Sequence, residues 1–239
     1  MAANKTVVTM VFLVLAAGAG YWFFSRDNEP DSADTTPPPG ASVAPAGESS
    51  AAGQTDPLAG STPGATSADL AKRYQCPGAD MDCANSPNVA ASAEEARWLL
   101  DHGYPTLEQI RDLKSRSTAD YEAEYRRTGS KVAQTLWAFS LSTNDEVRKA
   151  ITVLGEGVQQ GNVFAYYVLS DIYTRSPDFA NLTTSAAYLR AAYLAGDSKA
   201  GTMYAQKYGH LSPPEHANAD KVAFEYFTKV GKAKNYPRP

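Results

Sequence analysis

Residues 165–196 read AYYVLSDIYTRSPDFANLTTSAAYLRAAYLAG and carry the pattern of two amphipathic helices joined by a turn. In the first half, Ala165, Leu169 and Ile172 recur at helical spacing, which predicts one apolar helix face. In the second half, small alanines lie among bulky Tyr and Leu, so that paired helices can approach closely while the large side chains fill the gaps. Gly196 suits a left-handed position just after a helix. The stretch therefore predicts a helical hairpin.

The same pattern recurs along the chain with a period of 35 residues. Shifted by this period, Gly161, Gly196 and Gly231 fall in one column, and four further columns match in size and polarity. A fixed period of this length is typical of stacked helical repeats. Runs with the period of two that marks strands are absent after residue 24, so we expect an all-α fold.

The repeat itself resembles a known family. The pattern A-x-x-x-L-x-x-x-Y, followed by A-A-Y-L-x-x-A-A-x-x-A-G-x-x-x-A, resembles the Sel-one-like repeat, a relative of the tetratricopeptide repeat. The resemblance covers about residues 130–231, with a weaker copy before the middle unit and a partial copy after it. It departs from the family at the turns, residues 174–178 and 209–214, where the family usually carries G-x-G-V. The resemblance implies a short solenoid whose concave face binds peptides or proteins.

A helical cap of residues 69–129 is expected before the repeats of residues 130–239. Two segments, 92–95 (SAEE) and 143–146 (TNDE), read as capping boxes, in which a hydroxyl and a carboxylate satisfy the first free amides of a helix. Within the cap, the expected helices begin at Ser92 and then cover residues 107–114 and 119–127, the last ended by Gly129.

Cys76 and Cys83 are the only cysteines in the chain. Outside the cytoplasm, two cysteines this close are most simply a disulfide. Their spacing is not the C-x-x-C of redox proteins, and a zinc site needs about four ligands. We expect a structural bridge at the start of the cap.

The apolar segment of residues 7–24 predicts a membrane anchor. Its 18 residues carry no charge, and as a helix they would span about 27 Å of a hydrocarbon core of about 30 Å. Lys5 precedes the segment and acids follow it, so the positive-inside rule exports the rest. Residues 1–24 are thus expected to anchor the chain in a bacterial inner membrane, with its C-terminal domain in the periplasm. The alternative is a signal peptide cleaved near Ala19.

Residues 25–68 are built from Pro, Gly, Ala, Ser, Thr and Asp, and they read as a disordered tether. The net charge of −4 comes from this block, because acidic and basic side chains are equal in number from Asp69 onward. A domain without a basic field is a poor nucleic-acid binder.

Catalytic motifs are absent from the sequence, including H-E-x-x-H, G-x-S-x-G, a Walker loop and a dinucleotide fingerprint. His102 reads as a helix cap whose imidazolium would interact favourably with the helix dipole. His210 and His216 flank two prolines and lack a third metal ligand. We expect a non-enzymatic protein without metal or small-molecule cofactor.

In the repeat family, the first helix of each hairpin faces inward. Tyr167 and Asp171 lie off the packing face of one such helix, and the shift of 35 places Thr202 and Gln206 at the equivalent positions. These four residues are the candidate binding face. The expected function is a scaffold or adaptor for a protein partner in an envelope complex. The alternatives are a peptidoglycan- or glycan-binding protein that uses surface aromatics, and a cell-wall hydrolase in the same fold.

Overall fold

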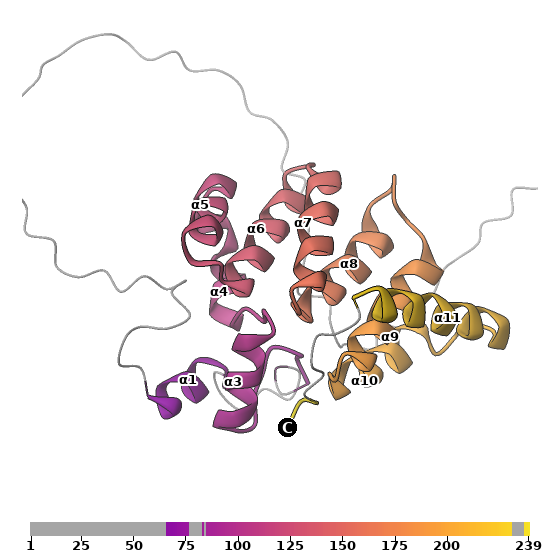
Figure 1. Ribbon diagram of the computed structural model, residues 1–239, viewed down its shortest axis with the longest axis horizontal. Helices are drawn as coiled ribbons and strands as arrows, with labels where there is room; N and C mark the ends of the chain where they lie inside the picture. Colours follow the sequence, from indigo (N-terminus) through magenta and orange to yellow (C-terminus); the bar gives the residue numbers. More distant parts are fainter. Residues whose placement is uncertain (1–65, 77–82, 84, 231–236) are drawn as a thin grey trace, which may run out of the picture. The chain divides into compact units, whose positions relative to one another are not determined.

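Every regular element that the structure describes is a helix. The computed structural model describes residues 66–76, 83, 85–230 and 237–239. Within them lie ten α-helices, one short 3-10 helix and no strand (Figure 1), which confirms the all-α prediction. None of the described helices is long and apolar enough to cross a membrane. The predicted anchor at residues 7–24 and the tether up to residue 65 lie outside the described residues.

The cap begins earlier than predicted. Helix α1 starts inside the expected tether because Thr66 and Asp69 form a reciprocal capping box that satisfies its first amides. A disulfide joins Cys76 to Cys83 shortly after this helix, as expected. The cap elements are α1 (Ser67–Arg73), α3 (Ala93–Asp101), α4 (Leu107–Arg111), the 3-10 helix η1 (Asp112–Ser115) and α5 (Thr118–Thr128).

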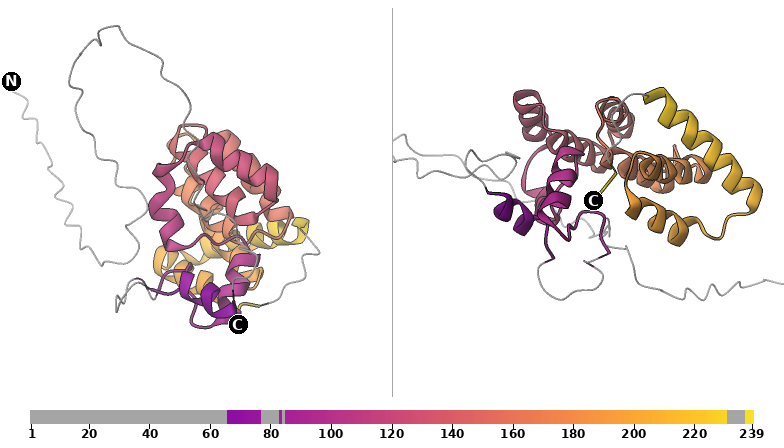
Figure 2. Two further views of the ribbon diagram at one scale, coloured as in Figure 1. Left: turned by 90° about the vertical axis from the view of Figure 1, so that its left-hand side faces the viewer. Right: turned by 60° about the horizontal axis from the view of Figure 1, so that its bottom comes forward.

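Six longer helices follow in the repeat region. α6 packs against α7 and α8 against α9, while α9 also contacts α10 and α11 (Figures 1 and 2). The long helix α11 thus lies alongside the second helix of the preceding hairpin. The repeat helices are α6 (Lys131–Thr143), α7 (Val147–Gln159), α8 (Phe164–Arg175), α9 (Leu182–Leu194), α10 (Ser198–Tyr208) and α11 (Pro213–Val230).

One predicted capping box, at residues 143–146, is wrong. Thr143 is the last residue of α6, and its hydroxyl donates back to the Ser140 carbonyl within that helix. The chain then turns through Asp145, whose φ is 62°. α7 begins after Glu146, which makes no side-chain cap. The hydroxyl therefore serves the helix it ends and not the one that follows.

The turns that connect successive hairpins place a short polar side chain just after a left-handed glycine. Gly161 and Gly196 both have positive φ, at 79° and 105°. Asn162 follows the first of them, and its amide reaches back to the side chains of Gln134 and Thr135 in α6. Asp197 follows Gly196 at the equivalent position. Asn162 and Asp197, 35 residues apart, therefore both point into the domain from a turn between helices.

Two glycines of α7 offer a matched test of this packing. A Cβ at Gly157 would lie 2.6 Å from Oε1 of the fully buried Gln134, whereas a Cβ at Gly155 would meet nothing within 4 Å. We expect Gly157→Ala to lower the free energy of unfolding by about 1–3 kcal/mol through overpacking. Gly155→Ala should raise it by up to about 1 kcal/mol through helix propensity. Urea unfolding of both variants checks this pair, and equal effects would contradict the described approach of α6 to α7.

Candidate functional site

Arg238, the penultimate residue, is buried between the cap and the repeats. Its side chain is 1% exposed, although arginine is almost never fully buried unless it is paired. The neighbouring Pro237 and Pro239 are exposed. The end of the chain lies between α3 and α10 (Figure 1), so residues distant in the sequence meet around a single guanidinium.

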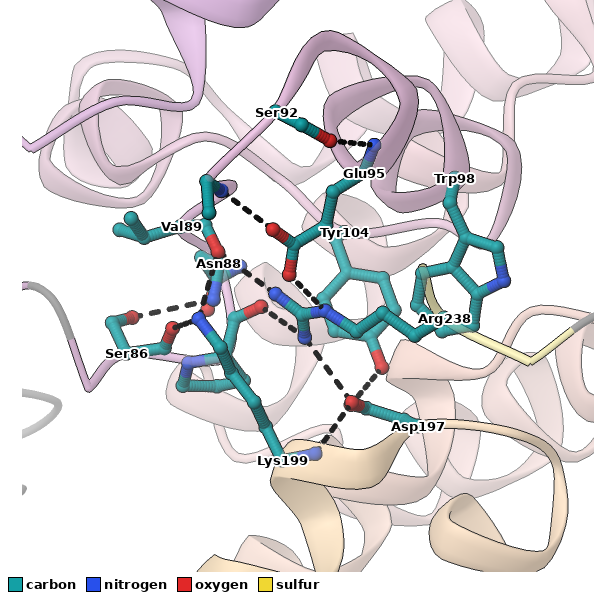
Figure 3. A network of polar contacts seen from close by, with 12 residues as sticks. Ser86, Asn88, Val89, Ser92, Glu95, Trp98, Tyr104, Asp197, Lys199 and Arg238 are labelled. Carbon is teal, nitrogen blue, oxygen red and sulfur yellow. Dashed lines mark hydrogen bonds and ion pairs between the residues drawn. The ribbon is translucent and has the colours of Figure 1, made fainter.

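Two carboxylates and two main-chain carbonyl groups surround this guanidinium (Figure 3). We call them the arginine cradle: Glu95, Asp197, and the carbonyl groups of Pro87 and Val89. The main-chain N–H of Arg238 also donates to the Gly196 carbonyl, at 2.9 Å. The guanidinium bonds are Nε to Glu95 Oε1 at 2.6 Å, Nη1 to Asp197 Oδ1 at 3.1 Å, Nη1 to the Pro87 carbonyl at 3.0 Å and Nη2 to the Val89 carbonyl at 2.8 Å.

Glu95 is held in place by the first turn of α3. Ser92 is the N-cap of that helix and accepts from the Glu95 N–H, as the predicted capping box requires. The reciprocal bond is shifted by one residue, because Oε2 of Glu95 accepts from the N–H of Ala91 and not from that of Ser92. One carboxylate oxygen is thereby fixed on the backbone, and the other faces Arg238.

Asp197 connects the cradle to the turn before α10, to Tyr104 and to α8. It is the N-cap of α10 and accepts from the Lys199 N–H. Its Oδ2 accepts from the hydroxyl groups of Tyr104, at 2.6 Å, and Tyr167, at 2.5 Å. With Arg238 on Oδ1, the carboxylate has four hydrogen bonds and no exposure to solvent. A buried charge is tolerated only when it is paired and hydrogen-bonded in this way.

The loop of residues 86–90 turns its carbonyl groups toward two cations. Besides the two carbonyl groups that bind Arg238, the loop accepts from Nζ of Lys199 through the carbonyl groups of Ser86 and Val89, at 3.1 and 2.9 Å. Two cations thus face two carboxylates, and the formal charges of the site balance. Burial, with the nearby Arg238 as a further cause, lowers the pKa of Lys199.

Aromatic rings line the rest of the cradle. The Cζ atom of Arg238 lies 5.8 Å from the ring centroid of Trp98 and 5.9 Å from that of Tyr104. Both distances are within the range of cation–π attraction. Burial and the Asp197 charge raise the pKa of Tyr104 and of Tyr167 well above the usual value. Their hydroxyl groups therefore stay protonated and act as donors to Asp197.

The four residues of the predicted binding face do not form one exposed surface. Tyr167 is only 7% exposed and points to Asp197, so its assignment to an exposed face is wrong. The ring of Tyr167 lies edge-on to that of Tyr104, and its hydroxyl donates to Asp197. Asp171 is half-buried and pairs with Arg175 at 2.8 Å. Thr202 and Gln206 are exposed on α10, and their role in binding stays a prediction.

The residues of the arginine cradle differ in how well the sequence alone could predict their position in the site. Asp197 follows the repeat glycine by one residue, as Asn162 does, so the period of 35 could have marked it. Glu95 was placed correctly at the start of a helix, but its second bond leads to a residue 143 positions away. Arg238, in the short tail Pro-Arg-Pro, lies beyond the repeat pattern and carries no such signal.

No protein-family model, curated protein or solved structure matches this chain. The functional argument therefore rests on the geometry of the cradle. That geometry is suited to recognition of a guanidinium: planar donors meet fixed carboxylate and carbonyl acceptors, with aromatic rings beside them.

The two later histidines lie outside the cradle. The hydroxyl of Tyr204 on α10 bonds to Nδ1 of His216 on α11 at 2.6 Å. His210 is exposed. Among the described residues, no group of three or more His, Cys, Asp or Glu side chains is arranged to hold a metal ion.

His102 provides a pH-dependent prediction. It caps α3 as expected, with Nδ1–H donating to the Trp98 carbonyl at 2.8 Å, but burial lowers its pKa, contrary to the expected favourable imidazolium. Below about pH 6.5 the unfolded chain therefore binds a proton at His102 more readily than the folded chain does. The free energy of unfolding accordingly falls as pH falls through this range. His102→Gln should flatten this dependence between pH 7.5 and 5.5 in urea unfolding. Identical pH dependence in both proteins would contradict it.

Proposed function

We propose that this chain is a membrane-tethered, periplasm-facing protein of the cell envelope whose helical repeats bind a protein partner. The uncharged segment at residues 7–24 supports the tether and the export. The Cys76–Cys83 disulfide suits an oxidising compartment. The Sel-one-like pattern supports a solenoid built for protein interaction.

One observation carries the interaction function, namely that the helical domain holds the arginine of a short non-helical segment among its own carboxylates and main-chain carbonyl groups. Most of the pocket comes from the turns before α10 and before α3, and the segment enters as a side chain with one main-chain hydrogen bond. Peptide-binding domains commonly use this combination of main-chain pairing for affinity and a side-chain pocket for specificity. This arrangement supports the proposal that the domain binds a peptide of a partner protein.

The interaction function is tested by cross-linking in the native membrane. A photo-crosslinking residue at Thr202 or Gln206, both exposed on α10, should capture a defined protein partner. The same residue at Gln159, exposed on α7, is the matched control. Capture at α10 and not at Gln159 supports the binding face, while equal capture at all three positions, or none, counts against it.

Glycan binding is the second candidate because large aromatic side chains are exposed on the second helices. Tyr193 of α9 is 47% exposed and Phe224 of α11 is 60% exposed. Sedimentation of the detergent-solubilised full chain with purified peptidoglycan separates this function from the first. Binding that is lost in Phe224→Ala would favour the glycan, and absence of binding would leave the protein partner.

A further inference from the structure

We propose that the arginine cradle is a binding site for an arginine-bearing, proline-flanked segment of another protein, and that the chain's own tail occupies it until that partner arrives. This inference rests on the proposed interaction function and names the chemistry of the ligand. Residues 237–239 then act as an intramolecular ligand of the cradle, in addition to stabilising the fold.

The first argument is that the described tail contributes a single residue to the site. Arg238 makes five hydrogen bonds to the rest of the domain, four from its guanidinium and one from its main-chain N–H. Pro237 and Pro239 are exposed. Any extended segment with one arginine offers the same five donors in the same arrangement, so nothing in these contacts requires that the arginine belong to this chain.

The second argument is that flanking prolines suit such a ligand. Proline has no N–H to leave unsatisfied and fixes φ near −65°, which favours an extended backbone before binding occurs. A pre-ordered segment loses less conformational entropy when it is held. The tail Pro-Arg-Pro therefore defines the class of segment that fits: a central arginine with a proline on each side.

The third argument concerns specificity for arginine over lysine. Through three different nitrogen atoms, the guanidinium reaches acceptors on three separate segments: the loop of residues 86–90, Glu95 of α3 and the junction at Asp197. An ammonium is a compact point charge and cannot span them. The cradle already satisfies one ammonium, that of Lys199, through the carbonyl groups of Ser86 and Val89. The acceptors that Arg238 uses are therefore matched to a planar guanidinium.

The test uses the full chain in detergent and a fluorescent peptide with the sequence of residues 235–239, NYPRP. In Arg238→Ala the tail no longer fills the cradle, and we expect the peptide to bind with an affinity at least about tenfold higher than to the intact chain, whose tail competes. A peptide with citrulline, a neutral isostere, in place of arginine should bind at least about tenfold more weakly. The double variant of Arg238→Ala and Glu95→Gln should bind the arginine peptide more weakly than Arg238→Ala alone.

Two results would overturn the proposal. Either a folded Arg238→Ala chain binds neither peptide, or it binds the arginine and citrulline peptides equally. If circular dichroism shows that Arg238→Ala does not fold, a site-specific protease site placed within residues 231–236 allows the folded chain to be cut before excess labelled peptide is added. Uptake of the peptide supports the proposal, and failure of the cut chain to take it up contradicts it.

The failure of this inference differs from failure of the proposed function. A partner captured equally by the intact chain and by Arg238→Ala, together with no peptide binding, leaves the interaction function standing and removes the cradle as its site. Peptide binding without any partner captured in the membrane shows that the cradle can take an arginine segment, but it removes the proposed partner at α10. Formation of dimers by the intact chain, with the tail of each copy in the cradle of the other, would identify a different occupant and overturn the proposal of a foreign partner.

Discussion

Arg238→Ala is expected to lower the free energy of unfolding by about 3–5 kcal/mol, because removal of one member of a buried ion pair leaves its partners charged and unpaired. Glu95 loses the cation that hydrogen-bonds to it, and Asp197 loses one of four donors. The carbonyl groups of Pro87 and Val89 each lose a hydrogen bond as well. Urea unfolding followed by circular dichroism measures the change.

Arg97→Ala is the matched control for this variant. Arg97 lies on α3, close to Glu95, and pairs with Asp101 at 3.1 Å, but both side chains are more than half exposed. Exposed pairs of this kind contribute about 0–1 kcal/mol. Arg238→Lys should recover only a minor part of the loss, since an ammonium cannot replace the planar fork. A loss in Arg238→Ala no larger than in Arg97→Ala would show that the tail is not held in solution.

Asp197→Ala should destabilise the fold by a comparable amount, about 3–5 kcal/mol, for a different combination of reasons. The substitution removes the N-cap of α10 and leaves Arg238 without one carboxylate. The hydroxyl groups of Tyr104 and Tyr167, both buried, lose their acceptor. Thermal or urea unfolding gives the magnitude.

Ser130→Ala is a suitable comparison because Ser130 is also an N-cap, but the structure gives its side chain a single bond, to the Ala133 N–H. The loss there should be about 1 kcal/mol. The double variant of Asp197→Ala and Arg238→Ala should cost less than the two single losses added together, because both remove the same contact. Strict additivity would mean that the two residues do not interact in the folded protein.

The sequence predicted those features that depend on local pattern. Helix ends at Ser92, Thr106 and Gly129, the disulfide, and the left-handed Gly196 all follow from neighbouring residues, and the structure confirms them. The error at residues 143–146 arose where one hydroxyl had two helices to cap.

The candidate site was beyond local pattern because it is assembled from contacts across the whole domain. Glu95 reads as an ordinary capping residue, and Tyr167 as an exposed one, until Arg238 and Asp197 are placed beside them. Helical spacing gives the side of α8 on which Tyr167 lies. It does not give what covers that side.

The position of Arg238, 143 residues after Glu95 in the sequence, has a consequence for the order of folding. Their ion pair closes a long loop, and such long-range contacts form late because the entropy lost on closing the loop is offset only once the contact is made. During synthesis, Arg238 is added after every described helix, so the cradle lacks its cation while those helices can already pack. The described helices can therefore assemble before the residue that joins α3 to the turn before α10 is available.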